Sequence, residues 1–244
     1  MKEKKKQDNT KRKKKQLLIA GCMFLVMAIA FTAVVKFVDV RSIGPNGSNV
    51  GLSAINRSVN NMFGGFNDFW YRLTEKTGLL LVLPVAAMAL IGLVELIKRK
   101  SFKKVDREFK VLAGFYAIVA LIYIFFEKVF VVNYRPVMIE GELEASYPSS
   151  HTMFAFCFCC SAIYVTNRVL RNRNKKLAIA FNALLALILV VNVVGRLLSG
   201  AHWFTDIFGG VLISAALVAF FNLVLILGDK ESAKTKVKTA EIKE

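Results

Sequence analysis

The chain has 244 residues, of which 55% are hydrophobic and only 21% are charged. A soluble domain of this size forms one core and rarely carries several apolar runs close to the length of a membrane span. Such runs recur here, so the composition excludes an ordinary soluble protein and indicates an integral membrane protein.

Six apolar runs approach the length of about 20 residues that a helix needs to cross a membrane. In chain order, the predicted spans are Leu17–Val35, Gly78–Ile97, Val111–Phe126, Thr152–Val169, Leu177–Val194 and Trp203–Leu227. The first run follows a basic head, but it is long for a signal peptide and has no small-residue cleavage site. We therefore interpret it as a retained anchor. The predicted fold is all-α, a bundle of six transmembrane helices.

Polar segments flank this predicted bundle, which occupies residues 17–228. Residues 1–16 form a basic head that we expect to be disordered, because a run of like charges has no apolar surface to bury. Residues 229–244 form a polar tail of mixed charge. No Pro-rich or Ser-rich linker divides the part between them, so we predict a single membrane domain.

The net charge of +17 could indicate nucleic-acid binding, but the positions of the basic residues favour another interpretation. Cytoplasmic loops of membrane proteins are enriched in Lys and Arg. If the N-terminus is cytoplasmic, 26 of the 34 basic residues fall on that side. They lie in the head, in the tail and in the loops 98–110 and 168–176. We therefore predict a multi-pass protein of the cell membrane with both termini in the cytoplasm and no nucleic-acid partner.

The loops 38–77, 127–151 and 195–202 then face the extracytoplasmic side. The first of them carries aromatic residues interleaved with polar ones between Met62 and Tyr71. This pattern predicts an amphipathic helix in the membrane interface. Such a helix could guide a lipid toward a site, although an aromatic belt that only anchors the protein is the simpler interpretation.

The chain contains only two histidines, and both fall at outward ends of predicted spans. His202 and Asp206 are four residues apart, so they share one face of a helix. A carboxylate that accepts the proton of one imidazole nitrogen leaves the other nitrogen free to attack. The alternative is that His202 and Asp206 form a pair that only stabilises the protein near the membrane interface.

His151 follows Ser149 and Ser150 at the predicted start of a helix. Serine is a good N-cap, and the free N–H groups at a helix start favour an anion such as phosphate. His151 would be placed there to act as a general acid. The residues taken alone are equally compatible with an ordinary capped helix.

Three cations lie at the same predicted membrane edges: Lys128, Arg135 and Arg196. Such groups can balance the charge on the oxygens of a phosphoryl group in transfer. Alternatively, they extend to lipid headgroups. The four cysteines all lie within predicted spans, where we expect them to pack as small apolar residues rather than bind metal.

These residues form three ordered blocks: Lys128-x6-Arg135-Pro136, Pro148-Ser149-Ser150-His151 and Arg196-x5-His202-x3-Asp206. The arrangement resembles the type 2 phosphatidic acid phosphatase family, which shares its site with vanadium haloperoxidases. The resemblance covers roughly residues 78–225. Two positions depart from the family pattern, because Ser150 replaces a usual glycine and Gly195 replaces a usual serine.

The resemblance implies a role for each matching residue. Catalysis would fall to His202 as nucleophile, Asp206 as its orienting partner and His151 as acid. The substrate phosphate would be bound by Lys128, Arg135, Arg196, Ser149 and the backbone near Ser150. The family mechanism requires no metal and no other cofactor.

The resemblance therefore implies a membrane enzyme that hydrolyses a lipid phosphomonoester or lipid pyrophosphate at the extracytoplasmic face through a phosphohistidine. Candidate substrates are a polyprenyl pyrophosphate, phosphatidylglycerol phosphate and phosphatidic acid. A phosphate or phospholipid transporter or binding protein could use the same basic site without hydrolysis. A haloperoxidase would share the residues, but it requires bound vanadate and is usually soluble. The sequence leaves the oligomeric state open.

Overall fold

The computed structural model describes residues 2–171 and 173–241, and almost all regular structure in them is helical. The α-helices are α1 (Lys2–Phe37), α2 (Ser53–Met62), α3 (Asp68–Leu80), α4 (Val82–Arg99), α5 (Arg107–Ile124), α6 (Ser150–Leu170), α7 (Lys175–Leu198) and α8 (Phe204–Glu241). Shorter elements are the strands β1 (Arg41–Ser42) and β2 (Asn49–Val50), the 3-10 turns η1 (Pro45–Gly47) and η2 (Phe102–Lys104), and the π-turn η3 (Phe125–Val129).

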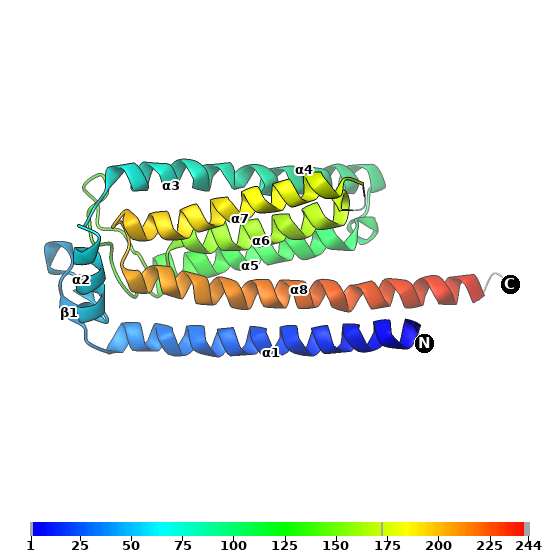
Figure 1. Ribbon diagram of the computed structural model, residues 1–244, viewed down its shortest axis with the longest axis horizontal. Coiled ribbons are helices and arrows are strands. Elements are labelled where there is room, and N and C mark those ends of the chain that lie inside the picture. The colour runs from blue at the N-terminus through cyan, green and yellow to red at the C-terminus, as the bar shows by residue number, and fades with distance from the viewer. Residues whose placement is uncertain (1, 172, 242–244) are drawn as a thin grey trace.

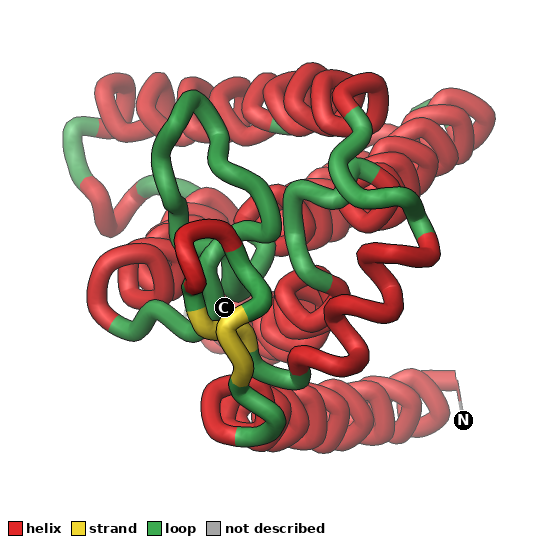
Figure 2. The backbone as a smooth tube through the Cα atoms, turned by 90° about the vertical axis from the view of Figure 1, so that its left-hand side faces the viewer, coloured by secondary structure: helices red, strands yellow, loops and turns green. Residues whose placement is uncertain are grey.

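The long helices lie side by side along one direction, and α3 and α4 follow each other nearly in line (Figure 1). Both termini are at one end of the bundle. The opposite end, seen face-on in Figure 2, is covered by α2, by loops and by the antiparallel pair β1–β2. The loops predicted to face outward thus gather at a single end of the molecule.

Five helical segments of the described chain are long and apolar enough to cross a membrane: Gln7–Phe37, Asp68–Arg99, Arg107–Val129, Lys175–Leu198 and Phe204–Gly228. They confirm the all-α class and five of the six predicted spans. The remaining prediction, Thr152–Val169, falls in α6, which is a helix of 21 residues but is not one of the five.

The apolar run of this remaining predicted span thus lies in α6, between polar helix ends. Polar residues stand at both of its ends, Ser150 and His151 at the start and Asn167 and Arg168 near the finish. The helix packs against α4, α5, α7 and α8, so protein rather than lipid surrounds much of it. A helix in that position needs a less continuous apolar surface than one that faces lipid.

Two other sequence predictions differ from the structure. The aromatic segment from residue 68 onward belongs to α3, which continues along the bundle with α4, so the prediction of an interfacial helix is wrong there. The basic head, predicted to be disordered, belongs to α1, which begins at Lys2. Lysine is a good helix former, and the apolar part of α1 provides a helix onto which the head can extend.

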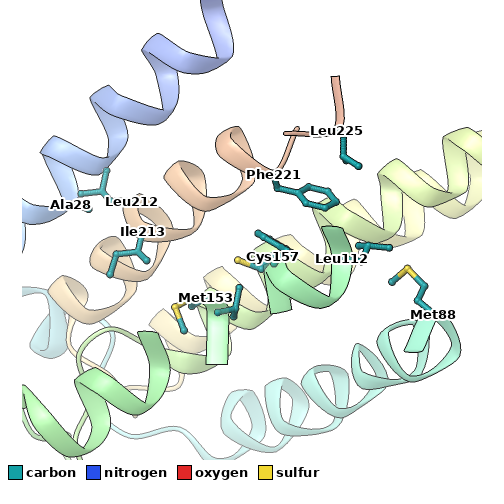
Figure 3. Close-up of a cluster of buried hydrophobic side chains, with 11 residues drawn as sticks. Ala28, Met88, Leu112, Met153, Cys157, Leu212, Ile213, Phe221 and Leu225 are labelled. Atoms are coloured by element: carbon teal, nitrogen blue, oxygen red, sulfur yellow. The ribbon is translucent and has the colours of Figure 1, made fainter. Parts of the chain in front are cut away.

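The main apolar core joins α1, α4, α5, α6 and α8 (Figure 3). Its buried members include Met88, Leu112, Met153, Cys157 and Phe221. The cysteines of α6 thus serve as packing residues in the core. Because this core lies between helices along the bundle, it fixes how the helix ends meet at the loop-covered end.

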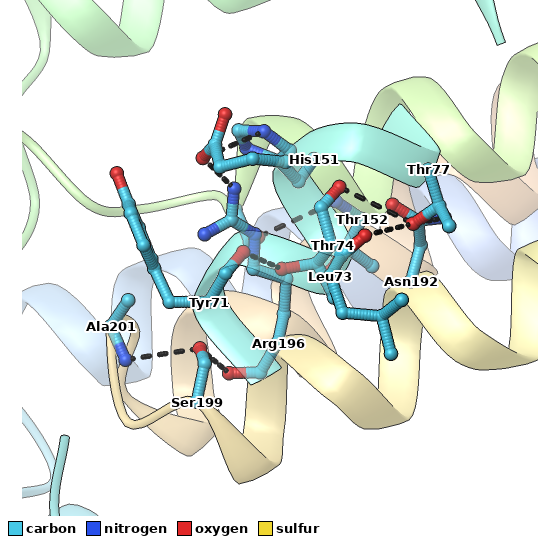
Figure 4. Close-up of polar contacts among 12 residues, drawn as sticks. Tyr71, Leu73, Thr74, Thr77, His151, Thr152, Asn192, Arg196, Ser199 and Ala201 are labelled. Carbon is cyan, nitrogen blue, oxygen red and sulfur yellow. Dashed lines mark hydrogen bonds and ion pairs between the residues drawn. The ribbon is translucent and has the colours of Figure 1, made fainter. Parts of the chain in front are cut away.

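The contact between α3 and α7 depends on Gly195. A Cβ atom at this position would lie 2.6 Å from Thr74 Cγ2 and 3.4 Å from Trp70 Cε3. Farther along the same contact, Asn192 Nδ2 donates to Thr77 Oγ1 over 3.2 Å (Figure 4). A serine, the usual family residue at position 195, would collide with α3, so the departure from the family pattern accompanies close packing of this helix.

Gly195→Ala should therefore destabilise the protein by about 1–3 kcal/mol, because the added methyl group overpacks the α3–α7 contact. Thermal unfolding in detergent measures the loss. The double variant Gly195→Ala/Thr74→Ser is the matched control, since it removes the colliding Thr74 methyl group and keeps the hydroxyl. It should recover most of the lost stability, and equal losses in both variants would contradict this packing account.

Candidate active site

A cavity of about 390 Å³ opens at the loop-covered end of the bundle. Helices α3 to α6 and the loop before α6 supply its walls. The ionisable residues that line it are Glu75, Glu127, Arg135, Glu144, His151 and His202. Both histidines of the chain therefore meet in one cavity, as their positions at predicted helix ends suggested.

His202 lies in the turn between α7 and α8, and only 3% of its surface is exposed. Its Nδ1 atom is 3.2 Å from the carbonyl oxygen of Ser146. A carbonyl can only accept a hydrogen bond, so Nδ1 carries the proton and Nε2 of the neutral ring carries the free lone pair. Within the described residues, His202 Nε2 is buried and has no hydrogen-bond partner.

The surroundings of His202 keep its ring neutral. Burial lowers its pKa well below the ordinary value, and the positive charges of Arg135 and Arg196 lower it further. Burial disfavours the charged imidazolium, and nearby cations do the same. The lone pair on Nε2 is consequently available near neutral pH.

Asp206 is fully buried in the first turn of α8, and its Oδ2 atom is 3.7 Å from His202 Nδ1. That separation is too long for the direct hydrogen bond that the sequence predicted. The carboxylate instead accepts hydrogen bonds from the Trp203 backbone N–H over 2.9 Å and from Asn133 Nδ2 over 3.2 Å. It thus secures the start of α8, while the Ser146 carbonyl sets the tautomer of His202.

Arg196 lies in the last turn of α7 with its side chain completely buried, and its guanidinium carbon lies 5.1 Å from the centre of the Tyr71 ring. Its Nη2 atom donates to Oε1 of Glu75 on α3. The same Glu75 oxygen is 3.2 Å from His151 Nε2. Figure 4 shows Arg196, Tyr71 and His151 gathered around this contact.

Arg135 is 9% exposed, and its Nε atom lies 2.9 Å from Oε2 of Glu144. The backbone N–H of Arg135 also donates to the Glu144 carbonyl over 3.0 Å, so the two residues face each other across a short loop. The pair places a second guanidinium at the cavity.

The two serines before His151 have different positions. Ser149 caps α6, accepting from the Thr152 N–H over 3.4 Å, and its own N–H donates to the Asp206 carbonyl over 2.9 Å. Ser150 lines the cavity at the first position of α6. The predicted helix start is confirmed, and the first backbone N–H groups of a helix have no partner within the helix itself.

Lys128 is not brought into the cavity. Its side chain is 73% exposed and lies 3.8 Å from Glu127, which lines the cavity instead. The π-turn η3 widens the end of α5 by one residue per turn, which changes the direction in which consecutive side chains point. The assignment of Lys128 to phosphate binding stays a prediction.

Several buried nitrogens around the histidines have no partner in the described part of the chain: Arg135 Nη1, Arg196 Nε, Arg196 Nη1 and His202 Nε2. Buried polar atoms are nearly always hydrogen-bonded to protein, water or a ligand, so these groups are available to bind a ligand. Guanidinium N–H groups bind the oxygens of planar or tetrahedral anions. The arrangement therefore fits an anion whose central atom can come within reach of His202.

Sequence reasoning missed Glu75, Ser146 and Asn133. Ser146 acts through its backbone carbonyl, which no side-chain pattern reveals. Asn133 donates to Asp206 from a loop, and only the fold brings the two together. Glu75 follows a polar stretch before an apolar run, so nothing in the sequence separates it from a solvated loop carboxylate.

Comparison with known proteins agrees with the resemblance read from the motifs. Residues 112–226 match the model of the PAP2 superfamily. The fold is similar to a crystal structure from Bacillus subtilis, described as the first transmembrane PAP2 type phosphatidylglycerolphosphate phosphatase, with a TM-score of 0.53 and 18% sequence identity. The match covers 87% of this chain and 96% of that one, whereas no curated protein matches. Residues 112–226, which hold both histidines, are therefore the part of this chain that is similar to the PAP2 superfamily.

Proposed function

We propose that this protein is a membrane phosphatase that hydrolyses a lipid phosphomonoester or lipid pyrophosphate through a phosphohistidine on His202. The observation that carries the proposal is the set of buried, unpartnered N–H groups of Arg135 and Arg196 around the free lone pair of His202. These groups match what phosphoryl transfer requires, because positive charge at the phosphate oxygens and an unprotonated nucleophile are both in place.

The reaction would take place in two steps. His202 Nε2 forms a bond to phosphorus as the bond from phosphorus to the leaving oxygen breaks, and His151 gives its proton to that oxygen. Water then attacks the phosphohistidine, gives a proton to His151 and releases inorganic phosphate. Arg135, Arg196 and the N–H groups at the start of α6 would hold the three remaining phosphate oxygens.

A lipid substrate fits the apolar side of the same cavity. Leu79, Leu81 and Val82 line it at the junction of α3 and α4, and Phe154 and Phe158 line it from α6. An apolar wall next to a cationic end suits a molecule with a phosphorylated head and a hydrocarbon tail. A polyprenyl pyrophosphate, phosphatidylglycerol phosphate and phosphatidic acid all meet this description.

His202→Ala should reduce phosphate release from such lipids by about 10³-fold or more, because the nucleophile is removed. Purified protein in detergent is assayed with EDTA present, since the proposed chemistry takes its positive charge from arginines. Lipid-phosphate binding should persist in the variant, which serves as the folding control. Undiminished phosphate release would end the phosphohistidine mechanism, and a wild-type protein that binds these lipids without hydrolysis would favour the transport or binding alternative.

The pH dependence of kcat/KM offers an independent test. Activity should fall on the acid side as His202 gains a proton, and the midpoint should lie below pH 6.5 because the pKa of His202 is lowered. Arg135→Gln removes one of the charges that lowers this pKa, so the midpoint should move upward. A substrate with a known phosphate pKa is needed. A wild-type midpoint above 6.5, or one unmoved by Arg135→Gln, would contradict the assignment.

We also propose that the site faces the extracytoplasmic side, opposite the basic loops and both termini. Arg57 on α2 and Lys103 in η2 are both exposed. Helix α2 lies at the opposite end of the bundle from the connection between α4 and α5 (Figure 1). In a chain without native cysteines, Arg57→Cys should react with a membrane-impermeant maleimide on intact cells. Lys103→Cys should react only after permeabilisation. The reverse pattern of labelling would place the site in the cytoplasm.

A further inference from the structure

Glu75 occupies the point where the phosphate-binding cation and the general acid of the proposed reaction converge. One oxygen of its carboxylate, Oε1, accepts from Arg196 Nη2 and lies 3.2 Å from His151 Nε2. In the proposed reaction a phosphate oxygen must take over the first contact and the leaving oxygen the second. The carboxylate therefore holds two contacts that substrate needs.

The position of Glu75 in the chain sets it apart from the other site residues. It lies on α3, outside residues 112–226 that match the PAP2 superfamily. The close packing of α3 on α7 at Gly195 brings it next to Arg196. The carboxylate is thus supplied by a helix that precedes the matched region in the chain.

The side chain of Glu75 is 42% exposed, whereas that of Arg196 is completely buried. Rotation about its side-chain bonds can therefore move the carboxylate toward solvent while α3 stays packed. Arg196 cannot leave, and a buried guanidinium without an anion is costly. An anion that enters the cavity would exchange with the carboxylate rather than bind beside it.

We propose that Glu75 is an intramolecular anion that occupies the phosphate site of the resting protein and is displaced by the substrate phosphate. The proposal rests on the function proposed above for this site. It gives Glu75 a part in specificity, because a phosphate with two negative charges displaces a carboxylate more readily than a singly charged phosphodiester does. Bulk phospholipids, which are phosphodiesters, would thus be kept out of the site.

The binding of orthovanadate, a tetrahedral analogue of phosphate, tests the displacement without any turnover. Glu75→Gln keeps the shape of the side chain and removes its charge, so it should bind orthovanadate about tenfold more tightly than the wild type, by isothermal titration calorimetry in detergent. Asp68→Asn is the matched control, since it removes one negative charge from the same helix at an exposed ion pair with Arg72. Its affinity should stay within twofold of the wild type.

Glu75→Ala provides a second variant in which no side-chain oxygen remains to accept from Arg196 or His151. It should bind orthovanadate at least as tightly as Glu75→Gln. Equal or weaker binding in both variants would overturn the proposal. A wild-type protein that releases no phosphate from any lipid would refute the proposed function, while the orthovanadate comparison would still decide the role of Glu75.

Steady-state kinetics distinguish the displacement of Glu75 by substrate from a role in which Glu75 supports His151 as the acid. An internal competitor raises KM, so Glu75→Gln should lower KM for a lipid phosphate by a larger factor than it changes kcat. A lower kcat with unchanged KM would instead show that Glu75 assists the acid, which would overturn the proposal.

The proposal that Glu75 excludes phosphodiesters is tested separately with glycerophosphoglycerol, a soluble phosphodiester. It should weaken orthovanadate binding to Glu75→Gln and leave binding to the wild type unchanged. Equal behaviour of the two proteins would overturn that part.

Discussion

The burial of a guanidinium at the end of α7 is the constraint on which the site depends. Arg196 is completely shielded from solvent, and a charge in that position is stable only with an anionic partner. In this structure Glu75 provides that partner, and Arg135 Nη1, Arg196 Nε and Arg196 Nη1 have no hydrogen-bond partner among the described residues. The helix bundle therefore holds a site with high affinity for anions at one end. The arginine N–H groups that Glu75 does not use can donate to the oxygens of a phosphoryl group.

The rest of the fold maintains this arrangement from several directions. The close contact of α3 with α7 brings the carboxylate of Glu75 to Arg196. Asp206 and Asn133 secure the start of α8, and the loop before α6 presents the Ser146 carbonyl to His202. Each contact joins segments far apart in the chain, so the site exists only in the assembled bundle. The same features that stabilise the helix ends also set the tautomer and charge of His202.

Much of this could be predicted from the sequence. Apolar runs located five candidate spans by length and composition, and the remaining run lies in α6. From the spacing of the motifs, we correctly predicted that His151, His202, Arg135 and Arg196 lie close together. The contributions of Glu75 and of the Ser146 carbonyl could not be predicted, since one needs the packing of α3 and the other is a backbone group.

The central claim is that His202 bonds covalently to phosphorus, and trapping of that bond tests it most directly. Wild-type protein mixed with a lipid phosphate is quenched in alkali within milliseconds, digested and sequenced by mass spectrometry. The account predicts an acid-labile phosphate on the peptide that contains His202, attached to its imidazole. Rapid phosphate release with no phosphorylated peptide, or with the phosphate on another residue, would contradict it.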